Sequence, residues 1–378
     1  MDDLIEATAA RMAARATREL EALVAVSSPS GDLAGAEEAA SIAAALAPDD
    51  TTVERVPCSS PGHADDLVLR VQGTGSRRLV LVGHLDTVIA HDRHRPLSRD
   101  GDKLLGSGTV DMKGGVVLAL GLLRALAAPE RRASFAEAAL LLVQDEEWRV
   151  GTFGHVERFA GFDVCLCFEA GQLTSDGGDA VIVKRKAAGT LRVLAHGRSS
   201  HSGSAPDQGR NALLGLAAAA QAVSAMHDPH GDLRLTAVPT ILRSGDAFNV
   251  VPAGGELFCD MRADDAVAFD AVLAAVPDVV GGVTLEPSLL RLWPGMDARG
   301  PAAGLLAAAG ERLGRSITGM DRGGASDASH FASTIPLTVD GLGPRGGGAH
   351  APNEFVLESS LRSRAEVALA IADAALRD

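Results

Sequence analysis

The sequence predicts an α/β protein with a mostly parallel sheet flanked by helices, and with a smaller α+β domain inserted into it. Two observations predict this fold. Up to about residue 183, short apolar runs alternate with helical patterns, as in a sheet covered by helices. From 184 the strands alternate in polarity, and the long apolar helix pattern returns after Pro294. We therefore expect one domain from residues 1–183 and 294–378, with residues 184–293 as the insertion.

The composition excludes several classes of protein. The chain has 378 residues, of which 46% are hydrophobic and 22% charged, as in ordinary soluble globular proteins. Its formal net charge of -14 argues against nucleic-acid binding. An acidic N-terminus and the lack of a long apolar run argue against a signal peptide or a membrane partner. Four cysteines without a CxxC pair are typical of reduced thiols, so we expect a cytoplasmic protein.

The pattern places the elements of both domains along the chain. In the outer domain, formed by residues 1–183 and 294–378, it predicts helices near 3–26, 33–47, 114–128, 151–160, 302–313 and 357–377. It predicts strands of the same domain near 52–56, 66–72, 79–84, 136–143, 162–168 and 335–339. In the insertion it predicts strands near 190–196, 233–242 and 256–262, and helices near 209–227 and 264–275.

Three apolar strands of the outer domain end in histidine or acidic residues. His84 and Asp86 follow the first, Glu146 and Glu147 the second, and Glu169 the third. Because sites in α/β sheets lie at the carboxyl ends of strands, we expect these groups to converge. Taken alone, His84-x-Asp86 fits either a metal ligand with its carboxylate partner or, more ordinarily, a core histidine bonded to an aspartate.

The adjacent glutamates allow two roles at one strand end. On an extended segment the side chains of Glu146 and Glu147 diverge, so one can bind a metal while the other faces a water molecule. The alternative for an Asp-Glu-Glu run is a solvated acidic turn. Here the run follows a buried strand and precedes a helix, and solvated charge explains that placement poorly.

Taken together, these motifs resemble the dinuclear zinc hydrolase family of glutamate carboxypeptidase, acetylornithine deacetylase and succinyl-diaminopimelate desuccinylase. The resemblance covers nearly the whole chain. It is strong because an unrelated chain would rarely contain all of these motifs in the same order. The matching stretches are Gly83–Val88, Gly106–Gly115, Asp145–Glu147, Phe168–Glu169, Ser200–Gly203, Pro206–Ala212, Asn249–Pro252, Asp260–Arg262, Gly323–Ala328 and His350–Glu354.

The resemblance implies a zinc exopeptidase-like catalytic domain with two Zn²⁺ per subunit. It places His84, Asp111 and Glu169 on one zinc, and Asp111, Glu147 and His350 on the other, so that Asp111 bridges. Histidine and carboxylate ligands without cysteine suit zinc and leave room for cobalt or manganese.

The same resemblance assigns the two remaining polar residues of the strand ends. Asp86 orients His84. Glu146 is the general base, which takes a proton from water and delivers it to the leaving amine.

For the inserted domain, the resemblance implies a lid and a dimerisation surface. The histidine matching His201 reaches the active site of the partner subunit and stabilises an oxyanion there, which implies a homodimer. Asn249 and Arg262 match residues that bind a substrate carboxylate, and Gly324 adds a backbone donor. An exposed loop is the ordinary alternative for His201, and an ion pair with Asp260 is the alternative for Arg262.

We therefore expect a hydrolase that cleaves an amide bond next to a free carboxylate in a small N-acyl amino acid or dipeptide-like substrate. The motifs favour a glutamate carboxypeptidase-like enzyme that releases a C-terminal amino acid. An N-acyl amino acid deacylase of the acetylornithine deacetylase or desuccinylase type is the alternative. A non-catalytic binding protein is a hypothesis of another class, and the complete set of ligands and Glu146 argue against it.

Overall fold

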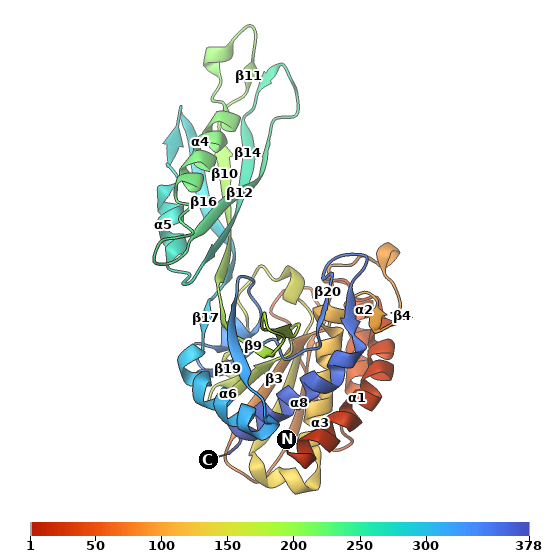
Figure 1. Cartoon of the computed structure of the whole chain (residues 1–378). Coiled ribbons are helices and arrows are strands. Elements are labelled where there is room, and N and C mark those ends of the chain that lie inside the picture. Colours follow the sequence, from red (N-terminus) through yellow and green to blue (C-terminus); the bar gives the residue numbers. More distant parts are fainter. Residues whose placement is uncertain (1, 378) are drawn as a thin grey trace. The chain divides into compact units, whose positions relative to one another are not determined.

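The computed structural model describes residues 2–377, and the chain divides into two compact units (Figure 1). The first unit runs to Lys184 and resumes over Asp297–Asp321 and from Ser326 onward. The second comprises Arg185–Met296 and Arg322–Ala325. The second unit is therefore inserted into the sequence of the first.

The central sheet of the first unit is mostly parallel in its middle, as predicted. Among the described residues it has six strands in the order β1-β2-β6-β3-β7-β19. β3 pairs in parallel with β6 and β7, and β7 with β19, whereas the two outer strands β1 and β2 are antiparallel. The strands are β1 (Thr52–Val56), β2 (Asp66–Gln72), β3 (Arg78–His84), β6 (Glu137–Val143), β7 (Val164–Cys167) and β19 (Leu337–Val339).

Helices cover this sheet and bury its apolar strands. α3 packs on β2, β3 and β6, while α1 and α8 pack on α3 and on each other (Figure 1). Because α3 is apolar on all sides, it lies inside the unit. Every helix in the described range is too short or too polar to span a bilayer. The helices are α1 (Asp3–Val24), α2 (Leu33–Ala45), α3 (Gly114–Ala127), α6 (Arg299–Leu313), α7 (Ala328–Phe331) and α8 (Glu358–Ala375).

Short strands complete the first unit and connect it to the insertion. β4, β5, β20 and β21 form one small sheet, and β8, β9, β17 and β18 form another. Their bounds are β4 (Ser98–Asp100), β5 (Lys103–Leu105), β8 (Gln172–Leu173), β9 (Asp179–Arg185), β17 (Met296–Asp297), β18 (Ile317–Arg322), β20 (Gly346–Gly347) and β21 (Phe355–Leu357).

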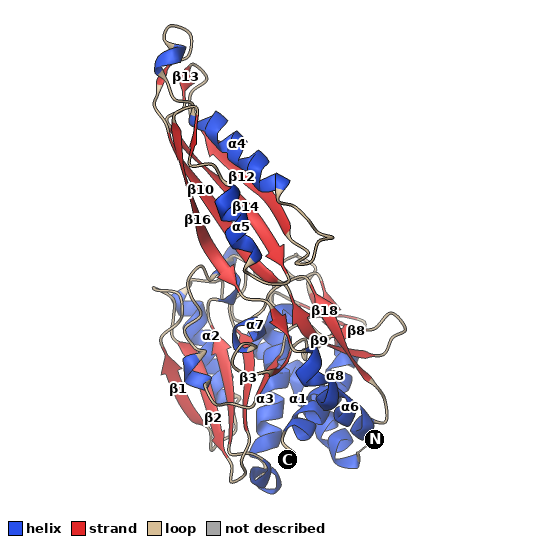
Figure 2. Cartoon of the chain, turned by 90° about the vertical axis from the view of Figure 1, so that its left-hand side faces the viewer, coloured by secondary structure: helices blue, strands red, loops and turns tan. Residues whose placement is uncertain are grey.

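The second unit is an antiparallel sheet with two helices on one face (Figure 2). The strand order is β12-β14-β10-β16-β15, and a separate pair, β11 and β13, lies beyond it. α4 and α5 bury the alternate apolar residues of the strands. The elements are β10 (Ala187–His196), β11 (Ser200–His201), α4 (Ala212–Ala225), β12 (Thr236–Ser244), β13 (Val250–Val251), β14 (Gly254–Ala263), α5 (Ala268–Ala275), β15 (Val279–Val280) and β16 (Val283–Trp293).

The structure confirms the α/β class but differs from the predicted elements in several places, since β9, β18 and the short strands of the two small sheets were not predicted. The helix expected over 151–160 is absent from this described stretch, where only Glu157–Phe159 forms a short 3-10 turn. Glycines 151, 154 and 161 interrupt the segment and weaken helix formation. The strand β16 was missed, because Pro287 and its polar neighbours hide the alternation of apolar residues.

Candidate metal centre

Three parallel strands bring the predicted polar residues to one edge of the central sheet. His84 is the last residue of β3, and it is paired in register with Val143 at the end of β6. Glu146 and Glu147 follow β6, and Glu169 follows β7. Because the three strands run in parallel, their carboxyl ends lie side by side.

Two loops add the remaining predicted ligands. Asp111 lies in an irregular turn, Thr109–Lys113, that leads into α3. This turn can approach the strand ends because Gly115, at the start of α3, has no side chain. A Cβ there would lie 1.8 Å from the backbone oxygen of Phe168. His350 lies before β21 with a left-handed backbone (φ 64°).

These residues form two triads that share Asp111. Oδ1 of Asp111 lies 3.1 Å from Nε2 of His84, which lies 3.9 Å from a carboxylate oxygen of Glu169. Oδ2 of Asp111 lies 3.0 Å from Nε2 of His350, which lies 3.1 Å from a carboxylate oxygen of Glu147. The two oxygens of one carboxylate thus face different imidazoles.

The charges of each triad stabilise one another. Burial alone would raise the pKa of Asp111, but hydrogen bonds from His350 and His84 outweigh it and lower that pKa. Burial would lower the pKa of His84, but Asp111 and Asp86 raise it well above its usual value. Hydrogen bonds to Asp111 and Glu147 raise the pKa of His350 to about 10. The neighbouring carboxylates thus favour the protonated form of both imidazoles.

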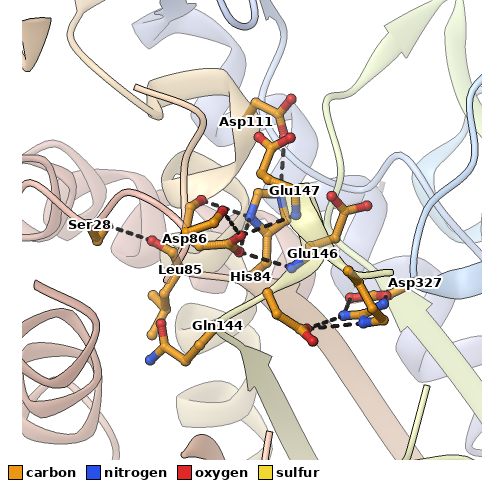
Figure 3. A network of polar contacts seen from close by, with 12 residues as sticks. Ser28, His84, Leu85, Asp86, Asp111, Gln144, Glu146, Glu147 and Asp327 are labelled. Atoms are coloured by element: carbon orange, nitrogen blue, oxygen red, sulfur yellow. Dashed lines mark hydrogen bonds and ion pairs between the residues drawn. The ribbon is translucent and has the colours of Figure 1, made fainter. Parts of the chain in front are cut away.

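Asp86 connects the first triad to the glutamate pair (Figure 3). Nδ1–H of His84 donates to the backbone oxygen of Asp86 at 3.0 Å and lies 3.3 Å from its carboxylate, which leaves Nε2 to face Asp111. The Asp86 carboxylate also accepts hydrogen bonds from the backbone N–H groups of Glu146 and Glu147, at 3.2 and 3.1 Å. Its contacts therefore extend beyond His84 to both glutamates.

Glu146 and Glu147 do not lie on the extended segment that we predicted. They begin a 3-10 turn, Glu146–Trp148, and the turn is what directs their side chains apart. Burial raises the pKa of Glu146 well above its ordinary value, and the negative charge of Asp327 adds to the effect. A carboxyl group with a raised pKa is suited to exchanging protons near neutral pH.

A buried ion-pair network that the sequence analysis missed supports this turn. Arg149 is fully buried and donates to Asp145 Oδ1 through Nε at 3.0 Å and Nη2 at 2.6 Å. Its Nη1 donates to Asp327, which lies in a distant part of the sequence. Its guanidinium also lies over the ring of Phe153, 4.6 Å from the centroid. The i,i+4 spacing of Asp145 and Arg149 was the available signal for an ion pair, but such a spacing does not show that the pair is buried.

The donor set fits a pair of divalent cations. Within the described residues, two groups have ligand atoms close enough to hold an ion: His84, Asp111 and Glu169, and Asp111, Glu147 and His350. Imidazole nitrogen and carboxylate oxygen are the ligands of zinc and related metals. These groups have the same members as the two ligand sets that the family resemblance implies.

The other predicted site residues belong to the second unit. His201, on β11, is exposed, and its Nδ1 accepts hydrogen bonds from the backbone N–H groups of Gly203 and Ser204, at 3.1 and 3.2 Å. Asn249 is also exposed, and its backbone oxygen accepts a hydrogen bond from Ser202. The β11–β13 pair therefore presents both residues to solvent.

Arg262 and Gly324 have partners of their own inside the second unit. Arg262 forms a double ion pair with Asp260, at 3.1 and 3.0 Å, which is the alternative that the sequence left open. The backbone oxygen of Gly324 accepts a hydrogen bond from Arg185 at 2.8 Å.

Comparison with known proteins identifies the family. Residues 80–374 match the profile of Peptidase family M20/M25/M40. The chain belongs to this family. It is 27% identical over 367 residues to carboxypeptidase G2 of Pseudomonas sp. (strain RS-16), covering 92% of this chain and 86% of that protein. It is 30% identical over 326 residues to a succinyl-diaminopimelate desuccinylase of Methylorubrum extorquens, covering 77% of this chain and 82% of that protein.

The fold is shared with solved M20 structures. An M20 family metallo-carboxypeptidase from Sulfolobus solfataricus superposes with a TM-score of 0.76 at 14% identity, covering 96% of this chain and 99% of that one. The family resemblance and the α/β fold class predicted from the sequence are thus confirmed. This M20 protein is a metallopeptidase or amidohydrolase, as expected.

Proposed function

We propose that this M20 enzyme hydrolyses an amide bond next to a free carboxylate and releases a C-terminal amino acid, as a glutamate carboxypeptidase would. The observation that carries the proposal is the pair of triads sharing Asp111, with Glu146 beside them. The alignment with carboxypeptidase G2, which spans 92% of the chain, supports this branch of the family.

In this proposal the two triads hold two divalent cations, with zinc as the expected metal. His84, Asp111 and Glu169 hold one, and Asp111, Glu147 and His350 hold the other. When bound, such a pair polarises a carbonyl oxygen and lowers the pKa of water. The histidines must lose their Nε2 protons as the cations bind.

The proton transfers belong to Glu146. Glu146 takes a proton from the attacking water and gives that proton to the leaving amine, and burial, which raises the pKa of its carboxyl group, favours the protonated form that the second transfer needs. Two contacts fix its position: the backbone hydrogen bond to Asp86, and the buried Asp145–Arg149 pair one residue away. A fixed base needs little reorganisation during the reaction.

We assign His201 the stabilisation of the oxyanion in the partner subunit. Because its Nδ1 accepts two backbone hydrogen bonds, its proton is on Nε2, which is then a donor that faces solvent. A donor of this kind is what a tetrahedral oxyanion requires. Asn249 and Arg262 would bind the substrate carboxylate, and Arg262 would leave Asp260 to do so.

The surface of the second unit supports the homodimer that this role requires. β12 is an edge strand, and its Val238, Ile241 and Leu242 are exposed. Leu214 of α4 is 63% exposed as well. Exposed apolar edge strands are sites of pairing between chains. Light scattering should give a dimer, and Ile241→Glu with Leu214→Glu should give a monomer. A wild-type monomer at micromolar concentration would contradict this part of the proposal.

The alternative is an N-acyl amino acid deacylase, which the 30% identity to succinyl-diaminopimelate desuccinylase favours. Two series of substrates separate the two functions. One series varies the acyl group on L-glutamate, and the other keeps a succinyl or acetyl group and varies the amino acid. An enzyme that requires glutamate but accepts many acyl groups is a carboxypeptidase. An enzyme that requires one acyl group but accepts many amino acids is a deacylase. No hydrolysis in either series by metal-loaded protein would contradict both.

A further inference from the structure

Glu354 is a buried carboxylate that belongs to neither triad. It is 3% exposed and lies four residues after His350. Its Oε2 accepts a hydrogen bond from the backbone N–H of Gly108 at 2.9 Å. Its Oε1 accepts hydrogen bonds from Val110 and Asp111 at 2.8 and 3.0 Å. One side chain thus satisfies three N–H groups of the segment that carries the shared ligand.

This segment needs an outside acceptor because its backbone is irregular. Gly108 has a left-handed backbone (φ 73°), and Asp111 has φ -127° and ψ 88°. Such a turn does not satisfy its own N–H groups as a helix does, and unpaired buried N–H groups are costly. The backbone oxygen of Glu354 accepts a fourth hydrogen bond, from Gly106 at 3.2 Å.

The same residue is tied closely to His350. The N–H of Ala351 donates to Gly348 at 2.9 Å, and the N–H of Glu354 donates to Ala351 at 3.1 Å, so consecutive tight turns join His350 to Glu354. Fixing Glu354 on the 106–111 segment therefore also fixes His350 relative to Asp111, whose facing atoms lie 3.0 Å apart.

We propose that Glu354 is a positioning residue of the metal centre, which sets the spacing between the ligands Asp111 and His350. It contacts no metal and no substrate. The inference rests on the metal centre proposed above, but not on the identity of the substrate. Residues that hold metal ligands in place commonly change metal affinity by 10- to 100-fold when they are replaced.

The test is a calorimetric titration in which Zn²⁺ is added to EDTA-stripped protein. Wild type should bind two equivalents. In Glu354→Gln the amide group presents N–H donors to backbone donors, so the hydrogen bonds cannot all form. We expect one equivalent to weaken by about 10- to 100-fold and the other to change less, because only one triad contains His350. Two equivalents at wild-type affinity in the folded variant would overturn the inference.

A matched control and a second measurement exclude a general loss of structure. Glu358→Gln makes the same change four residues later, in a surface ion pair with Arg99, and should keep wild-type affinities. If Glu354→Gln fails to fold, amide hydrogen exchange in the EDTA-stripped wild type tests the inference instead. The amides of Gly108, Val110 and Asp111 should be protected. Exchange as fast as that of an exposed loop would overturn the inference.

The titration also separates this inference from the proposed function. A wild type that binds two equivalents but cleaves none of the substrates would overturn the proposed function and leave the role of Glu354 standing. A wild type that binds fewer than two equivalents would overturn the metal centre, and the positioning role with it.

Discussion

Asp86 accepts a hydrogen bond from the backbone N–H of Glu146 at 3.2 Å, and this contact joins the ends of two neighbouring strands. The same carboxylate faces Nδ1 of His84 at 3.3 Å. A single buried aspartate therefore fixes both a candidate metal ligand and the candidate base. In the sequence it is visible only as the second residue of a His-x-Asp pair.

Replacing Asp86 should reduce both catalytic activity and metal affinity. Asp86→Ala leaves the N–H groups of Glu146 and Glu147 without their acceptor and removes the carboxylate beside His84. We expect kcat/KM and zinc affinity each to fall by about 10- to 100-fold. Asp100→Ala, on an exposed strand, is the matched control and should change neither. Wild-type zinc affinity in Asp86→Ala would show that His84 needs no such support.

The buried Arg149 should be important for stability. In Arg149→Met the carboxylates of Asp145 and Asp327 stay buried without their counter-charge, which costs about 3–5 kcal/mol. Urea unfolding measures this loss. Arg158→Met, in a more exposed ion pair with Glu54, should cost less than about 1 kcal/mol. Similar losses in the two variants would contradict the buried network of Asp145, Arg149 and Asp327.

The two tryptophans should differ in their response to a quencher. Trp148 is 65% exposed beside the glutamate pair, whereas Trp293 is 1% exposed. Acrylamide should therefore quench one part of the fluorescence readily, and Trp148→Phe should remove that part. The residual emission of Trp293 should be shifted to the blue. Unchanged quenching in Trp148→Phe would mean that Trp293 is accessible.

The cysteine thiols should be unreactive in the folded protein. Burial raises the pKa of Cys58, Cys165 and Cys167, and raises that of Cys259 to about 11. The thiolate is the reactive form, so these raised pKa values keep the thiols protonated at pH 8 and still largely protonated at pH 9. Ellman's reagent should label four thiols in guanidinium and react slowly with the native protein. Fast labelling of any native thiol at pH 8 would contradict these environments.

The strand ends were predictable because their signals are local. A buried apolar run followed by His84 or Glu169 shows both the strand and its polar end, and parallel pairing then predicts that such ends meet. The roles of Arg149 and Glu354 were not predictable, because their partners Asp327 and Gly108 are far away in sequence. The 3-10 turn at Glu146 was missed because neighbouring contacts, and not local propensity, form it.

In the proposed mechanism Glu146 transfers the proton while other residues hold the metals. The most direct test measures turnover and bound metal in Glu146→Ala, using the best substrate of the screen and Glu157→Ala, on the exposed 3-10 turn, as the control. We expect two bound metals per chain in both variants, with turnover lost by at least about 100-fold only in Glu146→Ala. Near wild-type turnover in Glu146→Ala would contradict the proposed role of Glu146.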